Sequence, residues 1–192
     1  MYFVWSSDAE LSDSYMYVSK APNGLNYTAW VTGEALVKEP PVATLIGDTD
    51  SPTKLSDMIL TQFELPILSP RAVSVLEKLG ADNIQYFPVT IKNWQTGDLE
   101  KSYRIANIVG LVNCLDKKHA TFNTFPEDEN KISWLQQYRI LEDKIPVKGR
   151  KTPLVFRLGE FPFHVLAHKS VKTAFEKERI TGSQFIAPEE FA

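Results

Sequence analysis

The sequence predicts an α+β fold with a mixed or antiparallel β-sheet and a few short helices, and it suggests two strand–helix–strand lobes. The main observation is a pattern that appears twice, at residues 65–91 and 154–188. Each copy has a short apolar run, a helix of about three turns, a glycine, and an aromatic strand that holds a proline. Short strands and turns before the first copy complete the prediction. The copies share this pattern more than residue identity, so they suggest a duplication without demonstrating one.

The first third of the chain reads as short strands separated by turns. Strands are expected at residues 2–5, 15–19, 28–31 and 42–46. The polar run 6–14, the turn signal Asn23-Gly24 and the segment Glu39-Pro40-Pro41 separate these strands. Residues 47–52 are expected to form a polar loop, and residues 54–62 a short helix.

Residues 69–80 carry the start and stop signals of a helix. Ser69 can accept hydrogen bonds from free backbone N–H groups, and Pro70 has a preset φ at the first helical position. Gly80 supplies the left-handed conformation that ends the helix. Apolar residues alternate along residues 87–91, so one face of the following strand is expected to be buried. Pro88 removes a backbone donor from that strand, which favours an edge strand or a bulge there.

The remaining elements come from apolar runs and from period-two alternation. Residues 103–112 are apolar on both faces, as in a central strand, and residues 120–130 read as a polar loop. Residues 132–141 fit a strand and a helix alike, and their aromatic and branched content favours the strand. The second copy supplies the last elements, which are strands at 154–158, 163–167 and 183–187 and a helix at 169–179.

Length, charge and cysteine content bound the class of protein. The 192 residues fit one domain spanning 1–192, subdivided into a β-rich N-terminal segment (residues 1–60) and an α+β segment (residues 61–192). The net charge of −3 gives no polybasic character that favours nucleic acid or an anionic membrane as partner. A single cysteine excludes an internal disulfide, and no apolar run approaches the ~20 residues of a membrane span. Because the N-terminus does not resemble a signal peptide, a cytoplasmic protein is expected.

Residues with catalytic or metal-binding chemistry do not form a known motif. His164 and His168 are four apart, but Val165 breaks the HExxH pattern, so a strand histidine and a helix-entry histidine are expected. His119 is expected in a solvated turn. Cys114 follows an apolar strand without a neighbouring histidine, as a buried structural thiol does. The glycines form no nucleotide-binding loop. We therefore expect no catalytic, cofactor-binding or metal site, and no enzyme.

Charge is unevenly distributed along the chain. Acidic residues gather near the N-terminus and in one later segment, at Asp8, Glu10, Asp13, Glu127, Asp128 and Glu129. Basic residues gather at Lys144, Lys148, Arg150, Lys151 and Arg157. An ordinary solvated surface explains this pattern, and the alternative is an acidic face, built from those six acids, that meets a basic partner. Nucleic-acid binding by the basic stretch is set aside, because no interleaved aromatic residues and no known module accompany it.

Three segments together resemble a known family. They are LPILSPRAVSVLEKLGADNIQYFPVTI, YRIANIVGLVNCLD, and LVFRLG followed by the second helix and ITGSQFIAP, all within residues 60–190. Their order and spacing are similar to those of immunity-protein family eleven of bacterial polymorphic toxin systems, formerly a domain of unknown function. Residues 1–60 match poorly, and His168 stands where a Ser or Asp cap is expected. The resemblance implies a non-enzymatic inhibitor that binds a cognate toxin encoded by a neighbouring gene, through no catalytic residue and no cofactor.

A cytoplasmic inhibitor meets toxins that act in the cytoplasm. The resemblance therefore implies a nuclease, a deaminase, an NAD-consuming toxin or an ADP-ribosylating toxin, rather than a cell-wall hydrolase. One alternative is a protein-binding scaffold or secretion-associated domain without a toxin partner. Another is an enzyme whose site is assembled only in the fold. A monomer is expected, or a weak homodimer formed through an edge strand near Pro88.

Overall fold

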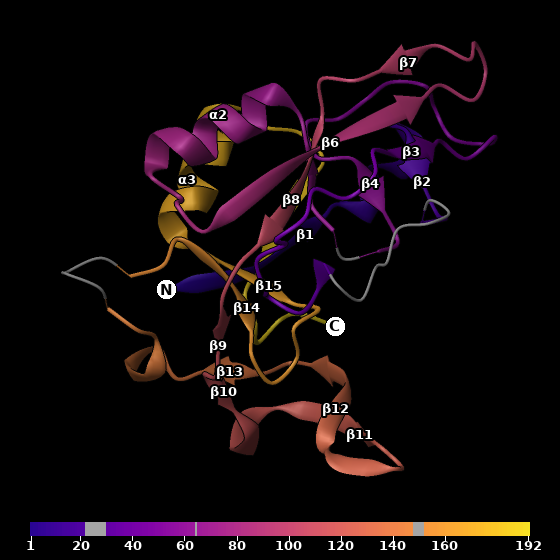
Figure 1. Ribbon diagram of the computed structural model, residues 1–192. Coiled ribbons are helices and arrows are strands. Elements are labelled where there is room, and N and C mark those ends of the chain that lie inside the picture. Colours follow the sequence, from indigo (N-terminus) through magenta and orange to yellow (C-terminus); the bar gives the residue numbers. More distant parts are fainter. Residues whose placement is uncertain (22–29, 64, 148–151) are drawn as a thin grey trace.

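Two five-stranded sheets form the framework of the chain, for which the computed structural model describes residues 1–21, 30–63, 65–147 and 152–192 (Figure 1). The first sheet has the order β3 (Ala43–Ile46), β6 (Ile84–Lys92), β8 (Arg104–Ile108) and β5 (Ile67–Leu68), with β7 (Leu99–Glu100) paired to β6. The second has the order β16 (Ser183–Ile186), β1 (Tyr2–Ser7), β15 (Val165–His168), β14 (Val155–Leu158) and β9 (Leu111–Val112). Both sheets contain parallel and antiparallel pairs, which confirms the predicted α+β class.

Each sheet contains one copy of the repeated sequence pattern, and the two copies fold with the same topology. In the first unit, β5 leads through α2 (Pro70–Leu79) to β6, and β8 lies between these strands, antiparallel to both. In the second unit, β15 leads through α3 (Lys169–Lys177) to β16, and β1 lies between them, antiparallel to both. Helices α2 and α3 pack against each other. The two strand–helix–strand units suggested by the sequence are therefore present.

The ends of the helices follow from local sequence. Ser69 Oγ accepts a hydrogen bond from the Ala72 N–H at 3.2 Å, and Gly80 ends α2 with a φ of 82°. Both capping predictions for the first helix are confirmed. In α3 the cap position is held by His168, whose Nδ1 accepts from the Ser170 N–H at 3.3 Å.

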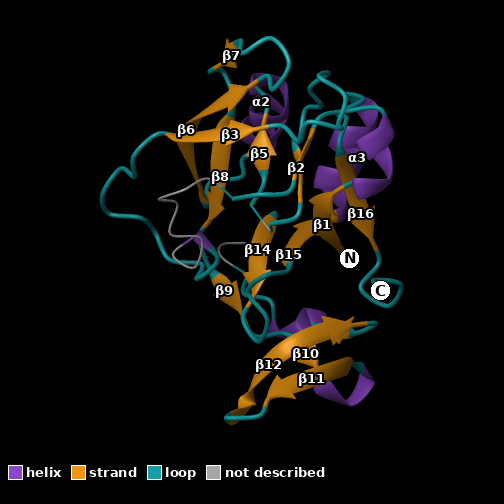
Figure 2. Ribbon diagram, turned by 90° about the vertical axis from the view of Figure 1, so that its right-hand side faces the viewer, coloured by secondary structure: helices purple, strands orange, loops and turns teal. Residues whose placement is uncertain are grey.

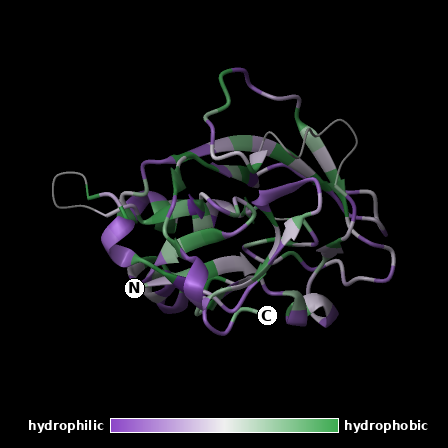
Figure 3. Cartoon of the chain, turned by 90° about the horizontal axis from the view of Figure 1, so that it is seen from below, coloured by the Kyte–Doolittle hydropathy of each residue, from purple (hydrophilic) through white to green (hydrophobic). Residues whose placement is uncertain are grey.

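Three hydrophobic clusters stabilise this arrangement. The first cluster lies between the two helices and both sheets, and Trp5 is central to it, with its ring 5.7 Å from Phe175 and 6.3 Å from Phe185. The second cluster joins the second sheet to the segments after β9, and the third covers the first sheet on its other side. Hydrophobic and hydrophilic residues alternate along several strands, as burial of one face requires (Figure 3).

Smaller strand pairs and 3₁₀ turns complete the described chain. The strand pairs are β2 (Tyr17–Val18) with β4 (Leu60–Thr61), β10 (Leu115–Asp116) with β13 (Arg139–Ile140), and β11 (Thr121–Phe125) with β12 (Asp128–Gln136). The 3₁₀ turns are η1 (Ala9–Asp13), η2 (Lys117–His119) and η3 (Glu142–Lys144).

The prediction of a helix at residues 54–62 is wrong. Met58, Ile59 and Leu60 are all buried, whereas a surface helix exposes one face of such a run. The backbone is instead extended and bonded to neighbours, with the Met58 N–H donating to the Thr181 carbonyl and the Ile59 N–H to the Ile67 carbonyl, both at 2.9 Å. These long-range hydrogen bonds replace the local bonds of a helix.

One further expectation is wrong, and another holds only locally. Residues 120–130 are not a polar loop, because β11 and the start of β12 form a hairpin there. Only a few of the side chains that face inward from this segment are apolar, so its composition resembles that of a loop. The edge strand or bulge expected at Pro88 is an edge only locally, because β6 as a whole lies between β3 and β8, while residues 84–88 pair with β8 alone. Pro88 lies where pairing with β8 ends, just before pairing with β3 begins at Val89, and its missing N–H falls at this change of partner.

The N-terminal part of the chain is integrated into the fold. Strand β1 lies inside the second sheet, next to strands from the last 30 residues. The turn Asn23-Gly24 and the first half of the strand expected at 28–31 lie outside the described residues, while Trp30 and Val31 are not in a strand. The subdivision at residue 60 stays a prediction. None of the helices in the described ranges is both long and apolar enough to cross a membrane.

Candidate functional site

The three N-terminal acids lie in and beside η1, directly after β1. Asp8 caps this turn, because its carboxylate accepts a hydrogen bond from the Glu10 N–H at 3.2 Å. The Asp8 N–H donates to the Gly182 carbonyl at 3.1 Å, which fixes the turn to the second unit. Glu10 and Asp13 are exposed. Of the three predicted binding residues, Asp8 therefore has a structural role, and the other two face solvent.

The later acids lie at the tip of the β11–β12 hairpin. Glu127 is in the turn, and Asp128 and Glu129 begin β12. Asp128 accepts a hydrogen bond from the Asn130 N–H at 3.1 Å and forms an ion pair with Lys131 at 3.3 Å, which together lower the pKa of its carboxyl group. Glu127 and Glu129 are exposed and form no ion pair within the described ranges.

The structure does not bring the two acidic groups together. η1 packs against β4, which lies in the upper right of Figure 1, and the β11–β12 hairpin forms the lower end of the molecule. The hairpin lies at that same end in the second view (Figure 2). A partner that contacts both acidic groups at once needs a large surface. Otherwise the two groups bind separately.

Exposed aromatic residues lie beside the acids of the hairpin. The side chains of Phe125 and Trp134 are 40% and 39% exposed. Exposure alternates along β11, with Asn123 and Phe125 exposed and Thr124 less so, and Trp134 is the cross-strand partner of Asn123. The pairing with β12 shifts register on both sides of Thr124, so Phe125 lies opposite Asp128. We call the aromatic face with Phe125 and Trp134, together with the adjoining exposed tip acids Glu127 and Glu129, the hairpin outer face. The predicted binding residues did not include these aromatic residues, because residues 120–130 were expected to be a loop and period two grouped Trp134 with Ile132.

The opposite face of the hairpin is anchored in the second hydrophobic cluster. Ile132 and Leu135 are buried there with Cys114 and Leu115, and Phe122 packs against them. Burial raises the pKa of the Cys114 thiol to about 12, which confirms the expected structural thiol.

The base of the hairpin is tied to the second sheet. Tyr138 is fully buried, and its hydroxyl lies 3.0 Å from Nδ1 of His164, with the two rings stacked. Burial lowers the pKa of His164 to about 4, so the ring is neutral at pH 7. The C-terminal segment adds two backbone hydrogen bonds, from the Gln137 N–H to the Phe191 carbonyl and from the Tyr138 N–H to the Pro188 carbonyl. The hairpin is therefore a supported element.

The other histidines occupy the positions expected of them. His119 lies in η2 with an exposed ring that contacts Asp116 at 2.7 Å. His168 ends β15 and caps α3, while His164 immediately precedes β15. Over the described ranges, no three His, Cys, Asp or Glu residues gather as a metal site would require.

Of the basic stretch, the structure describes Lys144 and Arg157, and only Lys144 is on the surface. Arg157 is fully buried in β14, and its Nη1 donates to the Pro162 carbonyl at 2.7 Å. Lys144 is exposed in η3. Lys148, Arg150 and Lys151 lie outside the described residues. The prediction that Arg157 belongs to a solvated basic group is therefore wrong, because all four residues of β14 are buried.

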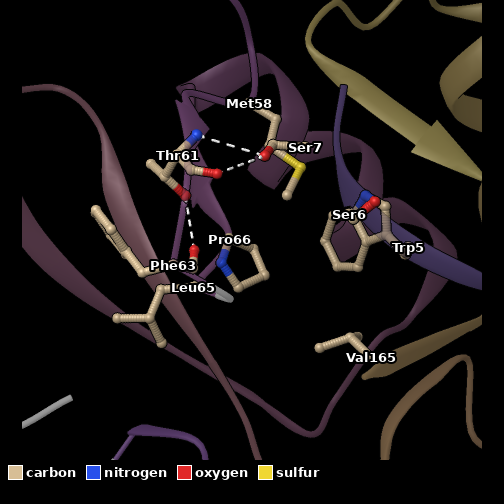
Figure 4. A pocket seen from close by; sticks show the side chains of 9 residues that line it. All are labelled: Trp5, Ser6, Ser7, Met58, Thr61, Phe63, Leu65, Pro66 and Val165. Atoms are coloured by element: carbon tan, nitrogen blue, oxygen red, sulfur yellow. Dashed lines mark hydrogen bonds between the residues drawn. The ribbon is translucent and has the colours of Figure 1, made fainter. Parts of the chain in front are cut away.

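A small cavity lies between β1, β4 and β15. Its volume is about 10 Å³, which is the size of a single water molecule. Trp5, Ser7 and Val165 are among its lining residues (Figure 4). Ser7 Oγ donates to the Thr61 carbonyl at 3.2 Å and joins β1 to β4. A cavity of this size accommodates no organic substrate.

Comparison with known proteins places the chain in one family. A sequence model described as Immunity protein family (Imm11) matches residues 3–190, which is almost the whole chain. The match includes the first 60 residues, so the poor match expected there is wrong. The position of β1 inside the second sheet gives the structural reason. Among curated proteins, no sequence matches the chain significantly.

Proposed function

Because the chain belongs to the Imm11 immunity protein family, we propose that it binds and neutralises a cognate bacterial toxin that acts in the cytoplasm. The observation that carries this proposal is the family match over residues 3–190. The toxin is encoded by a neighbouring gene and is a nuclease, a deaminase, an NAD-consuming toxin or an ADP-ribosylating toxin. The inhibitor works as a monomer or a weak homodimer.

Neutralisation occurs by binding, without a chemical step on the toxin. An inhibitor of this kind needs a stable scaffold and a complementary surface. The two packed units and three hydrophobic clusters supply the scaffold. The bound chain covers the catalytic cleft of the toxin or its path to substrate, and the affinity comes from a few well-packed anchor residues.

The acidic residues favour a basic toxin surface. Enzymes that handle nucleic acids or nucleotides are often positively charged around the cleft, and opposite potentials speed the encounter of two proteins. Asp8, Glu10, Asp13, Glu127, Asp128 and Glu129 contribute to the field that attracts such a surface. Asp8 also caps η1, so Glu10 and Asp13 are the suitable N-terminal positions for charge reversal.

A co-expression rescue tests this function. The adjacent reading frame is induced in a sensitive bacterium with and without this chain, and a catalytically inactive toxin variant serves as the toxicity control. We expect growth to be restored by the chain and the two proteins to purify together. Toxicity that the chain leaves unchanged contradicts the proposal and favours a scaffold or secretion-associated domain.

A further inference from the structure

We propose that the hairpin outer face is the surface that anchors the toxin, and that it takes a basic protein surface with a pocket for aromatic side chains. The inference rests on the proposed function and adds the position and the chemistry of the contact. Phe125 and Trp134 are the anchors, and Glu127 and Glu129 are the charged rim.

The exposure of Trp134 is the first observation. Trp5 and Trp30 are buried, and Trp94 is half-buried, with its Nε1 donating to the Ser51 carbonyl. Only Trp134 among the four tryptophans leaves 39% of its surface to solvent, and it does so on the same hairpin face as Phe125. Tryptophan is among the residues that contribute most to binding when a partner covers it.

The support beneath the face is the second observation. The inner side chains Ile132 and Leu135 are 6% and 2% exposed, and Tyr138 at the base is bonded to His164. A backbone held in this way loses little conformational freedom when a partner binds. The hairpin also lies at one end of the molecule in two perpendicular views, where a large partner can reach it (Figures 1 and 2).

The charge of the tip is the third observation and identifies the partner chemistry. Asp128 and Lys131 neutralise each other at 3.3 Å. The exposed carboxylates of Glu127 and Glu129 then leave the tip negative beside Phe125. A negative rim repels phosphate backbones and acidic proteins and attracts a basic protein. The occupant is therefore a basic surface of the toxin.

The test compares truncated anchors with a matched truncation elsewhere. The purified catalytically inactive form of the toxin from the adjacent reading frame is the probe, and its Kd for the chain is measured by calorimetry. We expect Trp134→Ala to weaken binding about 30-fold or more, with a smaller loss for Phe125→Ala. Leu99→Ala is the control, because Leu99 is 53% exposed on β7 in the first sheet, and it should leave the Kd unchanged.

Charge reversal provides a second variant that does not depend on the aromatic residues. Glu127→Lys with Glu129→Lys should slow association about tenfold at low salt and reduce its salt dependence. Glu77→Lys with Glu178→Lys is the control, because Glu77 is exposed in α2 and Glu178 is exposed at the end of α3. Thermal unfolding of every variant checks that the fold is retained.

The outcomes separate this inference from the proposed function. Wild-type binding with unchanged Kd and association rate for the hairpin variants overturns the inference and leaves the proposed function standing. A wild-type chain that neither binds nor rescues overturns both. Loss of a homodimer in Trp134→Ala, with unchanged toxin affinity, assigns the face to a second copy of the chain and also overturns the inference.

Discussion

The two strand–helix–strand units have the same topology but obtain their middle strand from opposite directions. In the first unit β8 follows the unit in the sequence, and in the second β1 comes from the N-terminus, far from β15 and β16. The antiparallel strand that lies between the two parallel strands can come from a segment before or after the unit in the sequence. The comparison teaches that the pattern of the unit determines its topology, while the strand that completes it depends on the rest of the chain.

The units also differ at the ends of their helices. α2 begins at a serine cap and ends at Gly80, which are common helix boundary residues. α3 begins at His168, and the chain after it passes through Arg179 at a φ of 52°. The first helix is therefore specified by local sequence, whereas the second relies more on its surroundings.

Asp57 joins the two units. Its carboxylate accepts hydrogen bonds from Ser69 Oγ at 2.8 Å, the Thr181 N–H at 3.0 Å and Arg71 Nη2 at 2.7 Å. Burial by itself raises the pKa of Asp57, but the hydrogen bonds from Thr181 and Ser69 and the charge of Arg71 outweigh it, so the pKa is lowered. One carboxylate thus links the start of α2 to the loop after α3.

The largest expected effect compares the glycines that follow the two helices. Gly182 and Gly80 have similar positive φ values of 79° and 82°. A Cβ at Gly182 would overlap the Met58 carbonyl and the Ser56 side chain, whereas a Cβ at Gly80 meets nothing within 4 Å. Gly182→Ala should cost about 3 kcal/mol or more and Gly80→Ala about 1 kcal/mol. Equal losses of unfolding free energy for the two variants, measured by urea unfolding, would show that the close contact at Gly182 is absent.

Removal of the Asp57 charge is expected to have the next largest effect. Asp57→Asn should cost about 2 kcal/mol at pH 7, because several hydrogen bonds to a charged acceptor are lost. The folded-state pKa is below the unfolded value, so the stabilisation is present above about pH 4 and disappears as the pH falls through the folded pKa. Urea unfolding of both proteins from pH 7 to pH 3 should show the difference shrinking. A constant difference would argue against the charge as its cause.

The smallest effect compares the two helix caps. Ser69→Ala removes both the cap and the hydrogen bond to Asp57 and should cost about 1.5 kcal/mol, and His168→Ala should cost about 0.5 kcal/mol. Burial and the N-terminal charge lower the pKa of His168, so its neutral ring caps the helix above about pH 6.5, and the cap is lost as the pH falls through the folded pKa. The cost of His168→Ala should therefore fall between pH 7.5 and pH 5, while the cost of Ser69→Ala stays constant. Parallel pH profiles would contradict the histidine cap.

Local signals explain which regions of the fold could be predicted. The limits of α2 follow from Ser69, Pro70 and Gly80, whose conformational preferences act within a few residues. The extended backbone near Met58 could not be predicted, because the Met58 N–H is bonded to Thr181, which is distant in sequence, and a helix period does not reveal the bond from Ile59 to Ile67. Residues 120–130 were expected to be a loop because they carry few apolar residues, whereas the strand expected at 132–141 is present in part as the end of β12.

The candidate site could be predicted only in part. Its acids were identified from composition, but their distribution over η1 and the hairpin depends on tertiary structure. Period two along residues 132–140 places Trp134 on the same face as Ile132, but the pairing with β11 shifts register between Asn123 and Thr124 and breaks this alternation. Ile132 and Leu135 lie on the buried face, and Trp134 lies on the other.

A stoichiometric titration of purified toxin activity tests the central claim most directly, because a binding inhibitor and an enzyme differ in the amount of protein they need. The toxin is held at a concentration well above the Kd, and its remaining activity is measured as the chain is added. Inhibition by binding predicts a linear fall in activity that ends at a fixed, whole-number ratio of chain to toxin. Complete loss of activity at a small fraction of one chain per toxin, or full activity in excess chain, would contradict it.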